Sequence, residues 1–420
     1  MLPRRSLSCL LVLFALMGVA NAQPTEAPAP APVGPPLAPG YLHEAEVFGK
    51  VIDNIGERLT PGPGMPKDGF YPEFGYMVTG SGWISLGPGY HHKFAQDRAL
   101  FETSAALSWR AYKMAQARVE YHAIGEDRLT IGAQGMWSDF TQVHYFGPGP
   151  DSSSSTQGSY RLQDVNTIGW ARYNLHPVVL TGTVGWLDRP TISSPAGFFR
   201  AGFPDARILF DATEAPGLRD PASFLHADLS AAVDTRDVPL HASKGGMYRV
   251  AIAQYSDRDS GQYSFQRYEV EGVQYVPLGS RNWVLAMHGW LVGSGLSDNH
   301  AVPVYMMPAL GGDDTLRGYV NFRFHDRSLL LASIESRWAL MSHIDLAAFF
   351  DAGNVAARVG DLNLSKNSVG VGVRVHTRTA TFGRLDLAHS KEGWRLLFKM
   401  DDPFQLTRLS RRLAAVPFVP

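Results

Sequence analysis

Cysteine is almost absent from this sequence of 420 residues, since the single one is Cys9. One cysteine forms no intramolecular disulfide and no cysteine-ligated zinc site. An excess of charge of one sign is also missing, because 38 lysines and arginines face 39 aspartates and glutamates and leave a net charge of -1. A chain without a basic excess lacks the electrostatic footprint of a nucleic-acid-binding protein. We therefore expect no cysteine chemistry and no nucleic-acid partner.

Long hydrophobic runs are missing as well. After residue 22 no stretch offers the roughly 18 uninterrupted apolar residues of a membrane-spanning helix. The content of charged residues, 18%, is low for a coiled coil, and 45% apolar residues is high for a disordered chain. What the sequence does have is 42 glycines and 11% aromatic residues. This composition favours β structure with many turns.

The first 22 residues are typical of a secretory signal peptide. Arg4 and Arg5 form its basic end, residues 10–20 form its apolar stretch, and residues 20–22 form a cleavage site with small residues at its ends. This apolar stretch is too short to span a bilayer as a helix. We therefore expect an exported protein, and an outer-membrane location follows from the strands considered below.

Two further segments precede the strands. Residues 23–40 are rich in proline and alanine, which predicts an extended linker. Residues 41–73 are expected to be periplasmic, and within them residues 43–58 place apolar side chains at helical spacing. This spacing predicts a short amphipathic helix, which we interpret as a cap over the periplasmic mouth.

Residues 74–404 alternate between apolar and polar side chains. In residues 368–377, four valines occupy every second position, and Arg374 and His376 lie on the opposite face. This alternation fits a transmembrane barrel with an apolar outer surface, and it also fits a soluble sandwich. The signal peptide and the even number of strands favour an all-β, transmembrane antiparallel β-barrel of about 16 strands.

The expected strands are residues 75–87, 99–111, 114–123, 127–137, 139–146, 159–174, 178–187, 224–234, 246–256, 262–276, 281–293, 328–339, 343–351, 367–377, 381–389 and 392–400. Some intervening turns are short, whereas three connections are long, at residues 147–158, 189–223 and 294–327. Short turns on one side and long loops on the other are typical of outer-membrane barrels.

The last long loop carries a distinctive group of residues. Gly311 and Gly312 precede the segment Leu316-Arg317-Gly318-Tyr319. Glu335 and Arg337 follow on one expected strand, and Asp351 and Gly353 end the next.

This order resembles the BamA/TamA outer-membrane assembly-factor superfamily, also called the bacterial surface antigen family. The family's Arg-Gly-aromatic tripeptide, in a loop folded back into the barrel, matches Arg317-Gly318-Tyr319. Its Glu-x-Arg element matches Glu335 and Arg337, and its Phe-x-Asp-x-Gly element matches residues 349–353. The resemblance implies outer-membrane lipid as a partner, together with unfolded outer-membrane proteins or other barrel proteins.

A physical argument supports a lumenal lock at Arg317. A guanidinium buried in a lumen is costly unless carboxylates pair with it. Strand alternation places Glu335 and Asp351 on the lumenal face, where both can accept from Arg317.

Two features depart from the family pattern. Residues 23–73 are too few and too rich in proline for a polypeptide-transport-associated domain, so we expect a barrel-only member. Phe404 matches the aromatic residue that usually closes the last strand, but residues 405–420 follow it and are expected to form a C-terminal tail.

Other residues predict no catalytic, metal or cofactor site. His91 and His92 lie in an expected loop without a fixed third ligand. Asp313 and Asp314 are interpreted as a solvated acidic loop. The tryptophans Trp290, Trp338 and Trp394 are interpreted as interfacial girdles.

Two functional classes follow, and an enzyme is not among them. The resemblance implies assistance in inserting or translocating outer-membrane proteins or lipids through a seam between the first and last strands. Glycines 75, 80, 82 and 87 weaken the expected first strand and favour this hypothesis. The alternative is a passive pore or a structural surface-antigen barrel.

Overall fold

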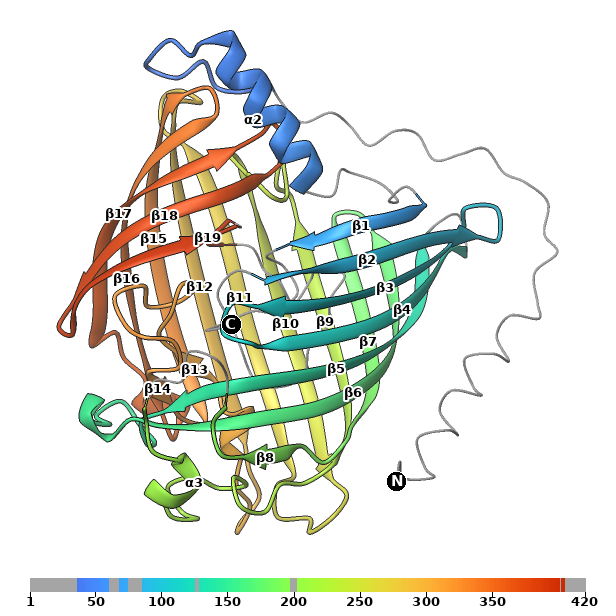
Figure 1. The fold of residues 1–420 in the computed structure, drawn as a ribbon, viewed down its shortest axis with the longest axis vertical. Helices are drawn as coiled ribbons and strands as arrows, with labels where there is room; N and C mark the ends of the chain where they lie inside the picture. Colours follow the sequence, from blue (N-terminus) through green and yellow to red (C-terminus); the bar gives the residue numbers. More distant parts are fainter. Residues whose placement is uncertain are drawn as a thin grey trace.

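The computed structural model describes residues 36–59, 68–74, 85–124, 128–196, 202–400 and 402–404. One antiparallel sheet dominates these residues and curves around a lumen (Figure 1). Sixteen of its described strands form the barrel wall, and a seventeenth, β8, is a three-residue strand beside β6. The predicted all-β antiparallel barrel is therefore confirmed.

The strands are β1 (Gly69–Phe74), β2 (Ser85–Phe94), β3 (Ala99–Ser108), β4 (Lys113–Ile124), β5 (Leu129–Tyr145), β6 (Gly158–Leu175), β7 (Val178–Leu187), β8 (Thr191–Ser193), β9 (Phe224–Asp234), β10 (Gly245–Asp257), β11 (Phe265–Pro277), β12 (Trp283–Gly295), β13 (Ala309–Leu310), β14 (Phe324–His325), β15 (Ser328–Met341), β16 (Ile344–Ala356), β17 (Lys366–His376), β18 (Thr381–Ser390) and β19 (Gly393–Lys399). The helices are α2 (Glu46–Leu59), α3 (Ala206–Leu209) and the 3₁₀ turns Ser154–Thr156, Val304–Met306 and Val359–Asp361. None of the described helices has the length and apolar character needed to cross a bilayer.

Barrel strands pair with their neighbours in chain order. Two connections interrupt this order: β7 pairs with β9, and β12 pairs with β15. The second interruption arises because β13 and β14 form a separate hairpin inside the loop of residues 296–327, which we call the lumenal loop. The long loops thus lie at one end of the barrel and the short turns at the other, as in outer-membrane barrels.

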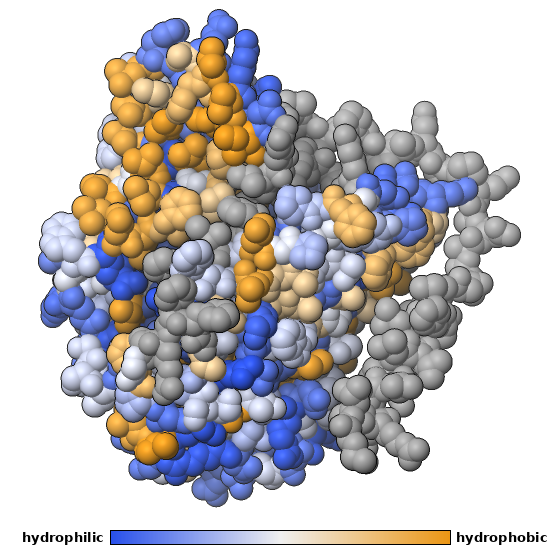
Figure 2. All heavy atoms as spheres, in the orientation of Figure 1, coloured by the Kyte–Doolittle hydropathy of each residue, from blue (hydrophilic) through white to orange (hydrophobic). Residues whose placement is uncertain are grey.

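Side-chain alternation follows the predicted faces. Val369 and Val371 are exposed on β17, whereas Arg374 and His376 of the same strand are buried. Figure 2 shows apolar side chains gathered on the outer surface over these strands. An apolar exterior around a charged interior is the arrangement of a transmembrane barrel and excludes the soluble sandwich.

One strand prediction was wrong, and another falls mostly outside the described residues. Residues 127–137 and 139–146 form the single strand β5, whose ladder with β6 continues past a register shift between Phe140 and Val143. The predicted first strand at 75–87 lies mostly outside the described residues, and β1 and β2 flank it instead. The glycines 75, 80 and 82 therefore also lie outside the described residues.

The predicted tryptophan girdles were partly wrong. Trp290 is buried and packs inside the barrel against the lumenal loop. Trp394 is exposed at the end of β19 near the long loops. At the opposite end, Trp338 stacks on Trp283 with 6.3 Å between ring centroids. This second pair marks the interfacial depth on the periplasmic side.

Candidate functional site

The lumenal loop returns into the barrel and has an apolar anchor. Leu316 and Tyr319 are fully buried and pack in one cluster with Trp290 and Leu331 of the wall. Gly311 and Gly312 both have positive φ angles, of 108° and 113°, where the loop turns inward. Only glycine adopts these angles without strain, so the pair permits the turn that brings Arg317 to the wall.

Arg317 is the ionic anchor of the loop. Its Nε and Nη2 donate to the two carboxylate oxygens of Asp351 at 3.0 and 2.8 Å. Its Nη1 donates to Glu335 at 2.6 Å, and its guanidinium lies 3.4 Å from the centre of the Phe349 ring. The side chain is 1% exposed. Burial alone would lower the pKa of Arg317, but Asp351 and Glu335 raise it above its ordinary value, so the cation persists.

Glu335 lies at the centre of a wider network. It accepts from Arg317, from Arg337 at 2.9 Å and from Arg374 at 2.8 Å. Arg374 also donates to Asp386 at 2.5 Å. Apart from Arg317, which lies in the lumenal loop, these residues come from the wall strands β15, β17 and β18. Alternation along each strand directs their side chains into the lumen.

Gly318 lies where the loop backbone touches the wall. A Cβ atom at this position would lie 2.6 Å from the Cβ of Ser368 and 2.7 Å from that of Ser390. Ser390 donates to the carbonyl of Gly318 at 2.7 Å. Gly353 lies on β16 beside Leu310 of the loop. The close approach requires a residue without a side chain at 318.

Asp314 is an ion-pair partner, and the interpretation of a solvated acidic loop was wrong for it. It accepts from Lys399 at 2.9 Å and from Arg384 of the neighbouring strand. Asp313 contributes its carbonyl oxygen to Arg384 at 2.8 Å. Burial would raise the pKa of Asp314, but Lys399 and Arg384 hold it below its ordinary value.

The chain beyond β19 enters the lumen instead of continuing the wall. Arg337 donates to Asp402 through both terminal nitrogens, at 2.9 and 3.2 Å. Phe404 is buried and packs against β11 and β12 through Tyr275 and Val284. The expectation that Phe404 closes the last strand was therefore wrong, because β19 ends at Lys399 and Arg337 offers Asp402 a buried ionic partner.

The charges in this network balance. We name it the charged cluster, and it contains the cations Arg317, Arg337, Arg374, Arg384 and Lys399 and the carboxylates Asp314, Glu335, Asp351, Asp386 and Asp402. A buried network with equal charge of both signs avoids the large cost of an unpaired ion. The sequence analysis missed Asp386 and Arg384 as members. Alternation with the exposed Leu385 and Leu387 was the signal for both.

The charged cluster predicts a loss of stability in acid. The pKa values of Asp314 and Asp402 are both lowered by their cationic partners. A carboxyl whose pKa is lower in the folded state contributes stability above its unfolded pKa of about 3.9 and loses it as the pH falls through the folded pKa. We expect the thermal midpoint of the barrel to fall as the pH drops below about 4. The Asp314→Asn variant should lose less on acidification, and equal losses in the two proteins would contradict this assignment.

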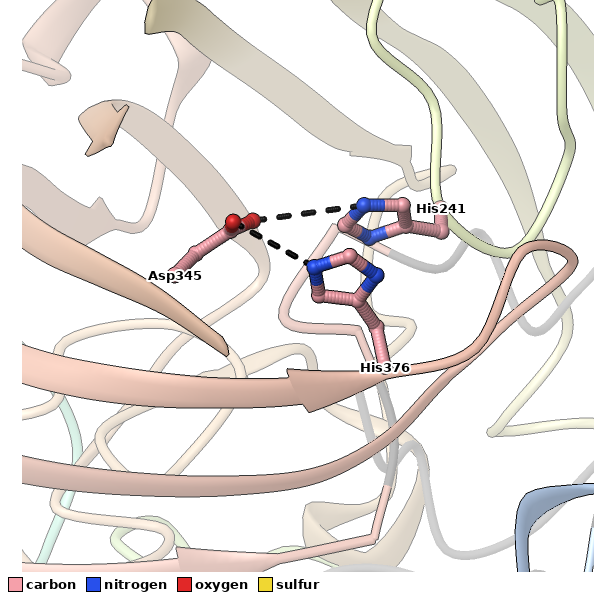
Figure 3. Close-up of side chains that lie close together, drawn as sticks. All are labelled: His241, Asp345 and His376. Atoms are coloured by element: carbon pink, nitrogen blue, oxygen red, sulfur yellow. Dashed lines mark hydrogen bonds and ion pairs between the residues drawn. The ribbon is translucent and has the colours of Figure 1, made fainter. Parts of the chain in front are cut away.

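A second polar cluster lies at the periplasmic mouth (Figure 3). His241 of the β9–β10 turn and His376 of β17 both face Asp345 of β16, at 3.9 and 3.3 Å. The two imidazole rings stack 3.7 Å apart at an angle of 15°. Burial and the neighbouring His376 lower the pKa of His241 to about 3, so this ring is neutral.

This cluster has the residue types of a metal site, but its rings do not converge. An ion in the plane of one ring lies out of the plane of a parallel ring, whereas a metal accepts the in-plane lone pairs of both. The hydrogen bonds favour a structural role. His241 Nδ1 lies 2.9 Å from the Thr381 hydroxyl, and the backbone N–H of Thr381 donates to Leu240. These contacts fix the β9–β10 turn across the mouth.

Two other histidines lie in a strand, so the expectation of a loop was wrong. His91 and His92 belong to β2 and point to opposite faces. His91 stacks on Tyr71 and lies 3.4 Å from Glu102, and His92 lies 3.4 Å from Asp68. Two rings on opposite faces of a strand do not share a ligand.

The comparisons with known proteins agree with this geometry. A model described as the Omp85 superfamily domain matches residues 216–392. The structure is similar to BamA from Haemophilus ducreyi lacking POTRA domains 1–3, with a TM-score of 0.58 and 12% sequence identity over 79% of this chain and 70% of that one. It is also similar to CdiB from Escherichia coli, with a TM-score of 0.53 and 10% identity over 81% of this chain and 63% of that one. A search of curated protein sequences finds no match.

At these identities the solved structures establish the fold alone. The domain match spans the lumenal loop and most of the wall strands that hold the charged cluster. Residues 216–392 therefore match the Omp85 superfamily domain, and the chain has the fold of the BamA barrel.

Proposed function

We propose that this protein assists the insertion or translocation of outer-membrane proteins or lipids through a lateral seam between β1 and β19. The observation that carries the proposal is how the barrel wall ends at β19. β19 has only seven residues, against 13 in β16 and 18 in β6. After β19 the chain turns inward at Asp402 and Phe404. Among the described residues, no antiparallel register joins β1 to β19.

The hydrogen-bond ladder between β1 and β2 also lacks donors. Pro72 of β1 faces Pro88 of β2, and neither residue has an N–H group to donate to the ladder. Proline is typical of edge strands, where the missing donor costs little. An edge with few hydrogen bonds is available to template an incoming strand, which is the physical basis of the proposed activity.

A passive pore receives less support from the interior. An apolar cluster fills the barrel toward the long loops and includes Val302, Tyr305 and Met306 of the lumenal loop, all fully buried. Water-filled channels have polar interiors at the constriction. The loop therefore favours a closed barrel with activity at its seam.

Reconstitution tests the proposal. Purified protein in liposomes should accelerate the membrane insertion of a second, unfolded barrel protein relative to empty liposomes. Conductance across a planar bilayer is measured on the same preparation. Unaccelerated insertion combined with steady conductance would identify a pore and refute the proposed function.

A further inference from the structure

Helix α2 presents an apolar face that the barrel leaves exposed. Val47, Val51 and Ile55 are 74%, 51% and 45% exposed, and Phe48 is 41% exposed. These residues form one stripe along the helix, since they are spaced by one, three and four positions. Lys50 lies on a different, polar side, where it is exposed and pairs with Glu46. A stripe of this width on a globular protein normally faces a core.

The barrel contacts a third side of the helix. Ile52 is buried there, and a Cβ atom at Gly56 would lie 2.1 Å from a methyl group of Thr377. His343, in the β15–β16 turn, lies 2.5 Å from Glu44 and 3.2 Å from Asp53. These contacts fix the rotation of α2, so the apolar stripe points away from the lumen and does not cover the mouth.

The helix starts at the depth of the membrane interface. The backbone N–H groups of Tyr41 and Leu42 donate to the carbonyls of Ala339 and Leu340, at 3.0 and 2.8 Å. Ala339 directly follows Trp338, which stacks with Trp283 in the periplasmic aromatic girdle. Aromatic girdles lie at the boundary between headgroups and acyl chains.

The apolar stripe continues the lipid-facing surface of the barrel. Figure 2 shows apolar side chains extending without a break from the outer surface of β17 and β18 onto the side of α2 that is in view. Leu346 and Leu385 are exposed members of this outer surface. One surface therefore faces lipid along the strands and along the helix.

We infer that α2 is an interfacial helix that binds the periplasmic leaflet of the outer membrane. Its apolar stripe enters the boundary between headgroups and acyl chains, while Lys50 remains in water. The helix then anchors the periplasmic rim beside β17 and β18. This corrects its interpretation as a cap over the mouth. The inference depends on the membrane location of the barrel and not on the proposed activity at the seam.

Cysteine labelling tests the inference in the full-length protein, because the sequence has no cysteine after Cys9. Val51→Cys and, separately, Lys50→Cys are labelled with a nitroxide and reconstituted in vesicles of phosphatidylethanolamine and phosphatidylglycerol. Relaxation by oxygen, which concentrates in lipid, is compared with relaxation by a water-soluble nickel chelate. The label at 51 should be several-fold more accessible to oxygen relative to nickel than the label at 50. Val47→Cys is the second variant and should match the behaviour at 51.

Three outcomes would overturn the inference. Equal nickel accessibility at 51 and 50 in vesicles would place both sides of the helix in water. Disulfide-linked dimers of Val51→Cys at high yield would assign the stripe to a second copy of the chain. A label at 51 that is shielded in detergent and released by deletion of residues 405–420 would assign it to the C-terminal tail.

Discussion

Replacing Arg317 by alanine is expected to lower the free energy of unfolding of the barrel by about 3–5 kcal/mol, the range for breaking a buried ion pair by removing one partner. Most of this destabilisation comes from leaving the Asp351 carboxylate buried without its cationic partner. This carboxylate is 0% exposed, and among the described residues it then keeps the Ser368 hydroxyl, at 3.2 Å, as its side-chain donor. Glu335 contributes less to the destabilisation, because Arg337 and Arg374 still donate to it. The measurement is the urea midpoint of the folded band on unheated gels.

Three further variants separate the ionic anchor from a general loss of packing. Arg317→Lys keeps the charge but not the two-pronged geometry, and it should lie between wild type and Arg317→Ala. The double variant Arg317→Ala/Asp351→Ala should lose less than the sum of its single variants, because no carboxylate is left unpaired. The matched control is Arg189→Ala, whose exposed pair with Asp259 should contribute little to stability, because water screens it. A midpoint for Arg317→Ala equal to that of this control would refute the anchor.

The wall could be predicted from the sequence because alternation is a local property. The residue pattern of each strand by itself indicates which side chains face lipid. Val369, Leu346 and Trp394 all point outward as expected. The prediction failed where no local feature of the sequence distinguishes one long strand from two shorter strands joined by a turn. β5 continues through Ser138 and Asp139 because both side chains find partners inside the barrel, Asp164 and Arg161.

The charged cluster was predictable only in part, for a reason of topology. Alternation places Glu335 and Asp351 in the lumen, and the resemblance to a known family brings Arg317 to them. The sequence contains no local information on how far a loop reaches. Asp314 therefore appeared solvated, although the fold places it between Lys399 and Arg384. The inward turn at Phe404 was missed for the same reason, since its partners on β11 and β12 are more than 100 residues away along the chain.

The proposed seam predicts a redox-dependent activity. Pairs of cysteines are placed on the exposed faces of the two end strands, with Phe70→Cys on β1 combined with either Leu396→Cys or Phe398→Cys on β19. Because β1 and β19 run in opposite directions along the wall, residue 70 lies toward the same end of the barrel as residue 398. Oxidation of a pair that links the strands should abolish assisted insertion in liposomes, and reduction should restore it.

The control pair is Leu86→Cys with Leu107→Cys. These residues are exposed register partners of β2 and β3, where the wall is continuous. A disulfide there leaves the proposed seam free, so oxidation should leave assisted insertion intact. The absence of other cysteines after residue 9 makes each cross-link unambiguous. If the linked β1–β19 pair and the control pair are equally active when oxidised, the strands need not separate, and the activity then belongs to the lumen or to another surface of the barrel.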